Sequence, residues 1–223
     1  PGSGIFEVSP FVRNKTRQRM ERRNFLKNSL LSTAAVAAGA PAFATQNSEA
    51  SAAANPFKMK YAPHFGMFEQ SAGKDLIDQL KFMADQGFSA MEDNGMMGRT
   101  KEMQTQIGET MAKLNMTMGV FVVAFDNWPL STSLTSGNKE WRDKFTAACR
   151  QAVEVAKRVN AKWMTVVPGN YDRNLPMGIQ TANVVESLRR GAEIFEPHGL
   201  VMVLEPLSDT PDLFMRYSDQ TFL

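Results

Sequence analysis

The chain has 223 residues, with 25 Lys and Arg against 23 Asp and Glu, which gives a formal net charge of +2. Residues 1–44 hold seven of the basic and two of the acidic residues, so the rest of the chain carries 18 basic and 21 acidic residues, a net charge of −3. This balance argues against the basic surface that nucleic-acid binding requires, and a single cysteine, Cys149, excludes an intramolecular disulfide.

The N-terminal region predicts an export signal rather than part of the fold. Residues 1–19 precede Met20 and look like an upstream segment that is not native to the protein. Residues 20–44 have a basic start with the pair Arg22-Arg23, a mildly apolar middle and an Ala-Phe-Ala end, the anatomy of a cleavable twin-arginine signal. The apolar stretch is too short and too interrupted for a stable membrane span. We therefore expect a periplasmic protein, with residues 45–57 as a flexible linker.

From residue 58 onward, short apolar segments alternate with helix-length amphipathic ones. The pattern predicts strands at 59–64, 88–92, 118–124, 163–167 and 200–205. It predicts helices between them, at 75–86, 101–114, 139–159 and 177–195. Such regular alternation indicates an α/β fold with a parallel sheet and right-handed crossovers. The turn after the first strand, HFGMFE, lacks the glycine-rich phosphate loop of a doubly wound sheet, so we prefer a β/α barrel.

A β/α barrel needs eight strand–helix units and about 250 residues. Only the first five units are expected in residues 58–223, with 212–223 as the start of the next helix. The sequence therefore predicts a partial barrel, as in a C-terminally truncated product, with side chains such as Met202 facing an open interior.

One carboxylate stands at the end of the fifth predicted strand. In EPHGLVMVLEPLS, four apolar residues precede Glu205, and Pro206 ends the strand because it lacks a ladder donor. Side chains at the carboxyl ends of barrel strands face the active site. A carboxylate there can bind a divalent metal or move a proton next to a carbonyl. The alternative is a glutamate that caps the strand and pairs with a neighbouring cation.

Three further residues are candidate substrate-binding groups. Glu92 ends the second strand and is expected at the same mouth as Glu205, with a structural salt bridge as the alternative. His64 ends the first strand, where it contacts substrate or is a packed, hydrogen-bonded residue. Arg173 follows the fourth strand and offers forked donors to a substrate carboxylate, unless it is simply solvated.

The segments KYAPHFGMF, QLKFMADQGFSAMEDNGMMGR, AVEVAKRVNAKWMTVVPGN and ANVVESLRRGAEIFEPHGLVMVLEPLSDTPDLF resemble the hydroxypyruvate isomerase family. That family lies within the xylose-isomerase-like TIM barrels, the sugar phosphate isomerase/epimerase superfamily. The resemblance implies interconversion of hydroxypyruvate and tartronate semialdehyde through an enediol. It also implies that Glu205 is an acid/base and a ligand of a divalent metal ion (Mg²⁺, Mn²⁺ or Zn²⁺). The second catalytic glutamate and the remaining ligands are expected on later strands, so this chain alone is expected to be inactive.

We therefore expect an isomerase that acts on a small hydroxy-keto acid or sugar. The main alternative is a non-catalytic, exported sugar-binding protein on the same barrel. A barrel endonuclease fits less well, because it needs a His-rich multi-metal site and the chain holds only His64 and His198.

Overall fold

The structure is a computed structural model that describes residues 57–222. The upstream segment 1–19, the predicted signal 20–44 and residues 45–56 of the predicted linker lie outside the described residues.

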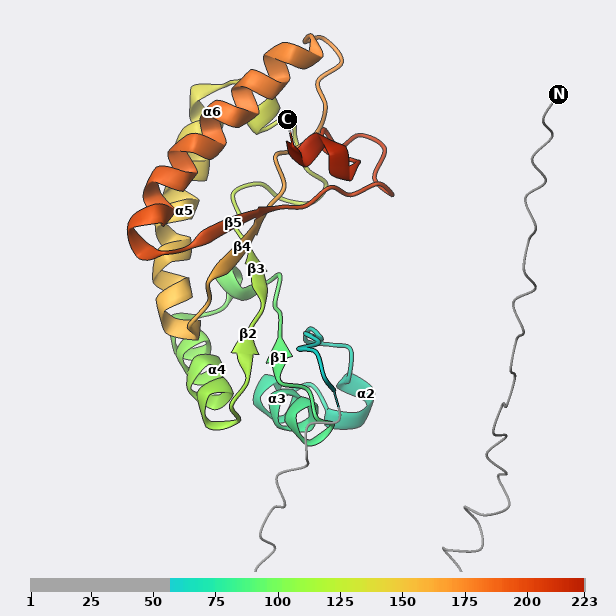
Figure 1. Cartoon of the computed structure of the whole chain (residues 1–223), viewed down its shortest axis with the longest axis vertical. Coiled ribbons are helices and arrows are strands. Elements are labelled where there is room, and N and C mark those ends of the chain that lie inside the picture. Colours follow the sequence, from blue (N-terminus) through green and yellow to red (C-terminus); the bar gives the residue numbers. More distant parts are fainter. Residues whose placement is uncertain (1–56, 223) are drawn as a thin grey trace, which may run out of the picture. The chain divides into compact units, whose positions relative to one another are not determined.

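The described residues alternate between helices and short strands (Figure 1). The strands are β1 (Ala90–Met91), β2 (Thr117–Met118), β3 (Val120–Val122), β4 (Trp163–Val166) and β5 (Val201–Leu204). The α-helices are α2 (Glu69–Ala72), α3 (Leu76–Asp85), α4 (Lys101–Lys113), α5 (Lys139–Val159) and α6 (Met177–Phe195). Short 3-10 helices are η1 (Met96–Gly98), η2 (Leu134–Ser136), η3 (Glu196–His198) and η4 (Ser218–Phe222). None of the helices within 57–222 has the length and hydropathy of a bilayer span.

The strands pair in parallel and in chain order, which confirms the predicted α/β fold. β1 pairs with β2, and β3, β4 and β5 form a continuous sheet. The predicted strand 118–124 is divided at Gly119, whose N–H donates to the carbonyl of Met91 at 2.7 Å. A Cβ at Gly119 would lie 3.1 Å from that oxygen, so glycine permits this close approach between neighbouring strands.

The first predicted strand is wrong in extent. Of residues 59–64, only His64 forms a bridge, parallel to Glu92. Pro63 has no N–H to give to a ladder, and the N–H of Tyr61 turns back to the carbonyl of Met59 at 3.2 Å. Among residues 57–222 this segment pairs with one neighbour only, through this single bridge.

The last predicted element also differs. The segment after β5 contains no α-helix up to residue 222; it ends in the 3-10 helix η4. The Gln220 side-chain oxygen accepts the N–H groups of Arg216 (2.6 Å) and Tyr217 (3.0 Å), which holds the chain in a tight turn. Phe214 and Met215 are buried, so this segment is anchored to the core.

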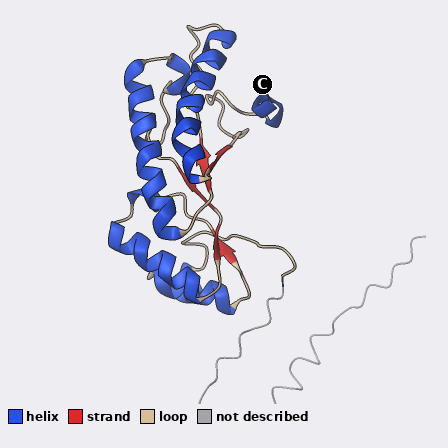
Figure 2. Ribbon diagram, turned by 60° about the vertical axis from the view of Figure 1, so that its left-hand side comes forward, coloured by secondary structure: helices blue, strands red, loops and turns tan. Residues whose placement is uncertain are grey.

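The predicted helix faces form the core. Side-chain caps start three helices: Asp75 accepts the N–H of Ile77 and Asp78, Thr100 caps α4 and Asn138 caps α5. The helices α3, α4, α5 and α6 each bury one stripe, and the buried residues include Leu80, Met83, Ile107, Met111, Phe145, Ala152, Val159, Val184 and Phe195. Figure 2 shows the helices as a layer against the strands.

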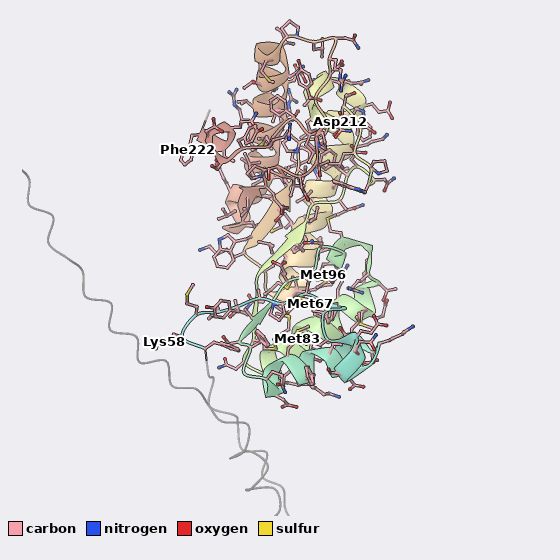
Figure 3. The ribbon with its side chains drawn as sticks, turned by 90° about the vertical axis from the view of Figure 1, so that its right-hand side faces the viewer. Lys58, Met67, Met83, Met96, Asp212 and Phe222 are labelled. Carbon is pink, nitrogen blue, oxygen red and sulfur yellow. The ribbon has the colours of Figure 1, made fainter. Side chains whose placement is uncertain are left out.

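Methionines fill much of this core, as do small residues. Met83 and Met96, labelled in Figure 3, are both 0% exposed and belong to one hydrophobic cluster with the strand residues. Cys149 on α5 is also fully buried, and burial raises the pKa of its thiol to about 12. The thiol therefore packs as a small apolar group rather than acting as a nucleophile.

Two glycines let the helices approach closely. A Cβ at Gly108 on α4 would lie 2.1 Å from the backbone oxygen of Arg158 on α5. A Cβ at Gly191 on α6 would lie 2.7 Å from the terminal methyl of Met202 and 2.9 Å from the Phe145 ring. The helices therefore pack against one another and against β5 at contacts that have no room for a side chain.

Gly108→Ala is expected to lower the free energy of unfolding by about 1–3 kcal/mol, because a backbone carbonyl cannot move aside as a side chain can. The steric cost opposes a gain of roughly 1 kcal/mol, because alanine has a higher helix propensity than glycine. Gly178→Ala on α6 is the matched control, since nothing lies within 4 Å of its added Cβ. Urea unfolding measures both; equal stability of the two variants would contradict the close crossing of α4 and α5.

Candidate functional site

Glu205 directly follows β5 and points away from the helix layer. Side chains alternate along a strand. Met202 contacts the α6 side at Gly191, and Leu204 lines an apolar pocket with Val184 and Leu188 of α6. Val203 and Glu205 therefore face the opposite, inner side of the sheet. The expectation that Met202 faces the interior is wrong: it packs against the helices.

A cleft of about 390 Å³ lies at this end of β3, β4 and β5. Glu205 and Val167, which follow β5 and β4, share it with the loop that follows β3. The other lining residues are Asn94, Val122, Val123, Ala124, Phe125, Asp126, Trp128, Leu130 and Leu207. Clefts at the carboxyl ends of parallel strands are where barrel folds bind their ligands.

Glu92 and His64 stand together at the neighbouring strand ends. They are partners in a parallel bridge, so their side chains project from the same face. A Cβ built on Gly119 would lie 3.5 Å from the Cβ of Glu92 and 3.4 Å from that of Ala62. Ala62, Glu92 and Gly119 therefore adjoin one another on one face of the strands.

The pKa of Glu205 depends on its burial and on the charge of Glu92. Burial of part of the Glu205 side chain raises the pKa of its carboxyl above the ordinary value, and the negative charge of Glu92 raises it further. The two carboxylates predicted at one mouth thus interact in the folded chain. A glutamate whose pKa is raised holds its proton nearer to neutral pH, as proton transfer to and from carbon requires.

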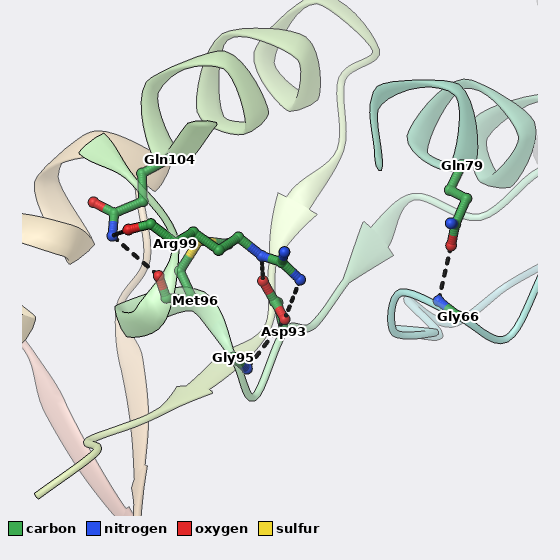
Figure 4. A network of polar contacts seen from close by, with 7 residues as sticks. All are labelled: Gly66, Gln79, Asp93, Gly95, Met96, Arg99 and Gln104. Carbon is green, nitrogen blue, oxygen red and sulfur yellow. Dashed lines mark hydrogen bonds and ion pairs between the residues drawn. The ribbon is translucent and has the colours of Figure 1, made fainter. Parts of the chain in front are cut away.

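A buried ion pair fixes the segments next to these residues. The Asp93 carboxylate binds the Arg99 guanidinium through both Nε and Nη2, the latter at 3.1 Å, and accepts the Gly95 N–H at 3.1 Å (Figure 4). Arg99 also lies over the Phe65 ring, 5.0 Å from its centre. Asp93 follows Glu92 and Phe65 follows His64, so Arg99 ties the two strand ends together.

Arg173 and His198 lie elsewhere. Arg173 forms an ion pair with Asp212 at 3.5 Å, its side chain is 84% exposed, and it does not line the cleft of Glu205. His198 is exposed in η3, just before β5 and therefore at the opposite end of that strand from Glu205. The structure places Glu205 within range of the charge of Glu92 and His64 beside Glu92, and it leaves Arg173 outside the cleft.

Comparison with known proteins matches this architecture. Residues 80–221, more than half of the chain, match the family described as xylose isomerase-like TIM barrel. The chain belongs to this family. No curated protein sequence is significantly similar to it.

Solved structures share the fold at low sequence identity. AP endonuclease, family 2, from Brucella melitensis is 18% identical with a TM-score of 0.58, over 70% of this chain and 59% of that one. D-psicose 3-epimerase from Clostridium cellulolyticum H10, solved with D-tagatose, is 16% identical with a TM-score of 0.55, over 71% and 55%. The IolI protein, solved with a zinc atom, is 15% identical with a TM-score of 0.57, over 74% and 57%. The chain thus spans less than two thirds of the length of these family structures.

The described residues do not complete a metal site. Within 57–222, no three His, Cys, Asp or Glu side chains gather closely enough to hold a metal ion. Glu205 offers one carboxylate toward such a site.

The loop after β3 supplies the part of the cleft that sequence reasoning missed. Phe125, Asp126, Trp128 and Leu130 all line the cleft. The signal was present, because FDNWPL directly follows a predicted strand and so belongs to the active-site end of a barrel.

Glu205→Gln is expected to stabilise the fold at neutral pH. A raised pKa in the folded state means that the ionised carboxylate opposes folding. This penalty is absent below the ordinary glutamate pKa and develops as the pH rises through the higher folded value, so the gain from Gln should vanish in acid.

Glu186→Gln is the control of opposite sign. A hydrogen bond and the charge of Arg190 lower the pKa of Glu186, so its carboxylate stabilises the fold above the ordinary pKa and loses this effect as the pH falls. Its replacement should destabilise at neutral pH. Thermal midpoints from pH 3 to pH 8 measure both effects, and a Glu205→Gln variant less stable than wild type at neutral pH would contradict the account.

Proposed function

We propose that the complete protein is an isomerase or epimerase of a small hydroxy-carbonyl compound, either a sugar or a hydroxy-keto acid of the hydroxypyruvate type. The observation that carries the proposal is Glu205, a carboxyl with a raised pKa in a cleft at the strand ends. The D-psicose 3-epimerase that shares the fold supports a sugar-type reaction.

In this proposal Glu205 takes the proton from the carbon next to the substrate carbonyl, which leaves an enediolate. Return of this proton to the former carbonyl carbon, together with transfer of the neighbouring hydroxyl proton to the enediolate oxygen, gives the aldose–ketose isomer. Return of a proton to the opposite face of the original carbon gives an epimer and needs a second acid. The charge of Glu92 favours the protonated form of Glu205 and so helps it to return the proton. The Asn94 amide, which lines the cleft, can hydrogen-bond a substrate oxygen.

We also propose that the complete protein binds a divalent metal ion with Glu205 as one ligand. The zinc atom in the IolI structure supports this, and the other ligands would come from residues outside 57–222. Such an ion would stabilise negative charge on the enediol oxygens.

Nucleic acid is the alternative substrate that the name of the Brucella protein suggests. His64 and His198 lie at opposite ends of the strands, and the chain after residue 44 has a net charge of −3. Both observations favour a small-molecule substrate.

Export through the twin-arginine pathway to the periplasm is a further part of the proposal, supported by the motif at residues 20–44. Replacing both Arg22 and Arg23 with Lys should leave uncleaved precursor in the cytoplasm, because the pathway reads the arginine pair. Immunoblots of periplasmic and cytoplasmic fractions measure this. Unchanged export of the double variant would refute the assignment.

Glu205→Gln in the complete protein should lower the rate of isomerisation or epimerisation by about 10²–10⁴-fold, because Gln keeps the size of the side chain but cannot carry the proton. Glu92→Gln should cost less, since Glu92 acts only on the pKa of Glu205. Glu69→Gln on α2 is the control and should leave the rate unchanged.

The assay follows conversion of hydroxypyruvate and of a panel of ketoses, with and without chelator, and circular dichroism verifies folding. A folded Glu205→Gln variant with a near-normal rate would contradict the proposed role. Binding of sugar by the wild type without any conversion would instead favour a sugar-binding protein.

A further inference from the structure

The cleft beside Glu205 has an apolar wall and an excess of negative charge. Trp128, Leu130, Phe125 and Leu207 provide the wall. Among the described lining residues, Asp126 and Glu205 are acidic and none is Lys, Arg or His.

Trp128 is 65% exposed although it lines this cleft. Exposure of a large aromatic side chain leaves its ring available to a ligand, provided that the loop that carries it is held in place.

The loop around Trp128 is held at both ends. The Asp126 carboxylate accepts the N–H groups of Asn127 and Ser131, both at 2.9 Å. Asn170, after β4, donates its backbone N–H to the Ser131 carbonyl at 2.7 Å and its side-chain amide to the Leu130 carbonyl. Trp128 is therefore carried by an ordered loop that is tied to the neighbouring strand end.

The turn that supplies Asn170 is itself packed tightly against this loop. Gly169 has a φ of +108°, and a Cβ there would lie 2.2 Å from the Ser133 hydroxyl and 2.8 Å from the Ser131 carbonyl. Only glycine fits this close approach, so the position of the Trp128 loop relative to β4 and β5 is preorganised.

We propose that Trp128 is the platform on which this cleft stacks the C–H face of a sugar. The hydroxyl groups of such a sugar would hydrogen-bond to Asn94 and to the carboxylate of Glu205. The inference rests on the proposed function and specifies its substrate class.

The test measures binding to the full chain by isothermal titration and saturation-transfer NMR. The probes are the ketoses D-tagatose and D-fructose, and we expect both to bind.

Trp128→Ala should weaken ketose binding about tenfold, the scale of one aromatic contact, and Trp128→Phe should restore most of it. Trp163→Phe is the matched control: Trp163 is also exposed but begins β4, roughly 13 Å along the strand from Val167. Thermal midpoints verify that each variant is folded.

Ketose binding that survives Trp128→Ala, or the absence of ketose binding, would overturn the inference. Trp128-dependent binding without conversion of any ketose would support the role of Trp128 and overturn the proposed isomerase or epimerase chemistry.

Discussion

Backbone hydrogen bonds between parallel neighbours set the register of the strands, from Val120 opposite Trp163 to Val166 opposite Leu204. Because parallel strands in chain order end at the same edge, this register places the residues after each strand at one mouth. Glu205 and Val167 line the same cleft for this reason. The charge of Glu92 raises the pKa of Glu205 although the two residues are far apart in sequence. A shift of one residue would turn Glu205 toward α6 and remove it from the cleft.

Contacts on the helix side of the strands and contacts at the mouth protect this register. Outside, Met202 fits against Gly191 and Phe145, where a larger residue would push β5 away from α6. At the mouth, the Asp93–Arg99 pair joins the ends of the first two strand segments, and Asn170 joins the loops after β3 and β4. The mouth is therefore built from side chains and loops that are held by other contacts before any ligand binds.

Much of this fold could be predicted from local patterns. Helix faces such as Leu80–Met83 and Phe145–Ala152 follow a spacing of three and four, β5 is an unbroken apolar run, and β4 is apolar except for Thr165. The local sequence pattern did not predict features that depend on contacts with another segment. A continuous apolar run does not show which face of the sheet Met202 occupies, and the break in the strand at Gly119 depends on the Met91 carbonyl. Glu205 was predictable from its place after a strand, whereas Trp128 depends on Asn170, 42 residues later in the sequence, to hold its loop.

The most direct test of this account is the pKa of the Glu205 carboxyl itself, followed by carbon-13 NMR in the wild type and in Glu92→Gln. The account predicts a wild-type pKa above the ordinary glutamate value. It also predicts a decrease in Glu92→Gln that stops short of that value, because burial is the larger cause of the shift. An ordinary pKa in the wild type, unchanged by Glu92→Gln, would show that the two carboxylates do not share one mouth.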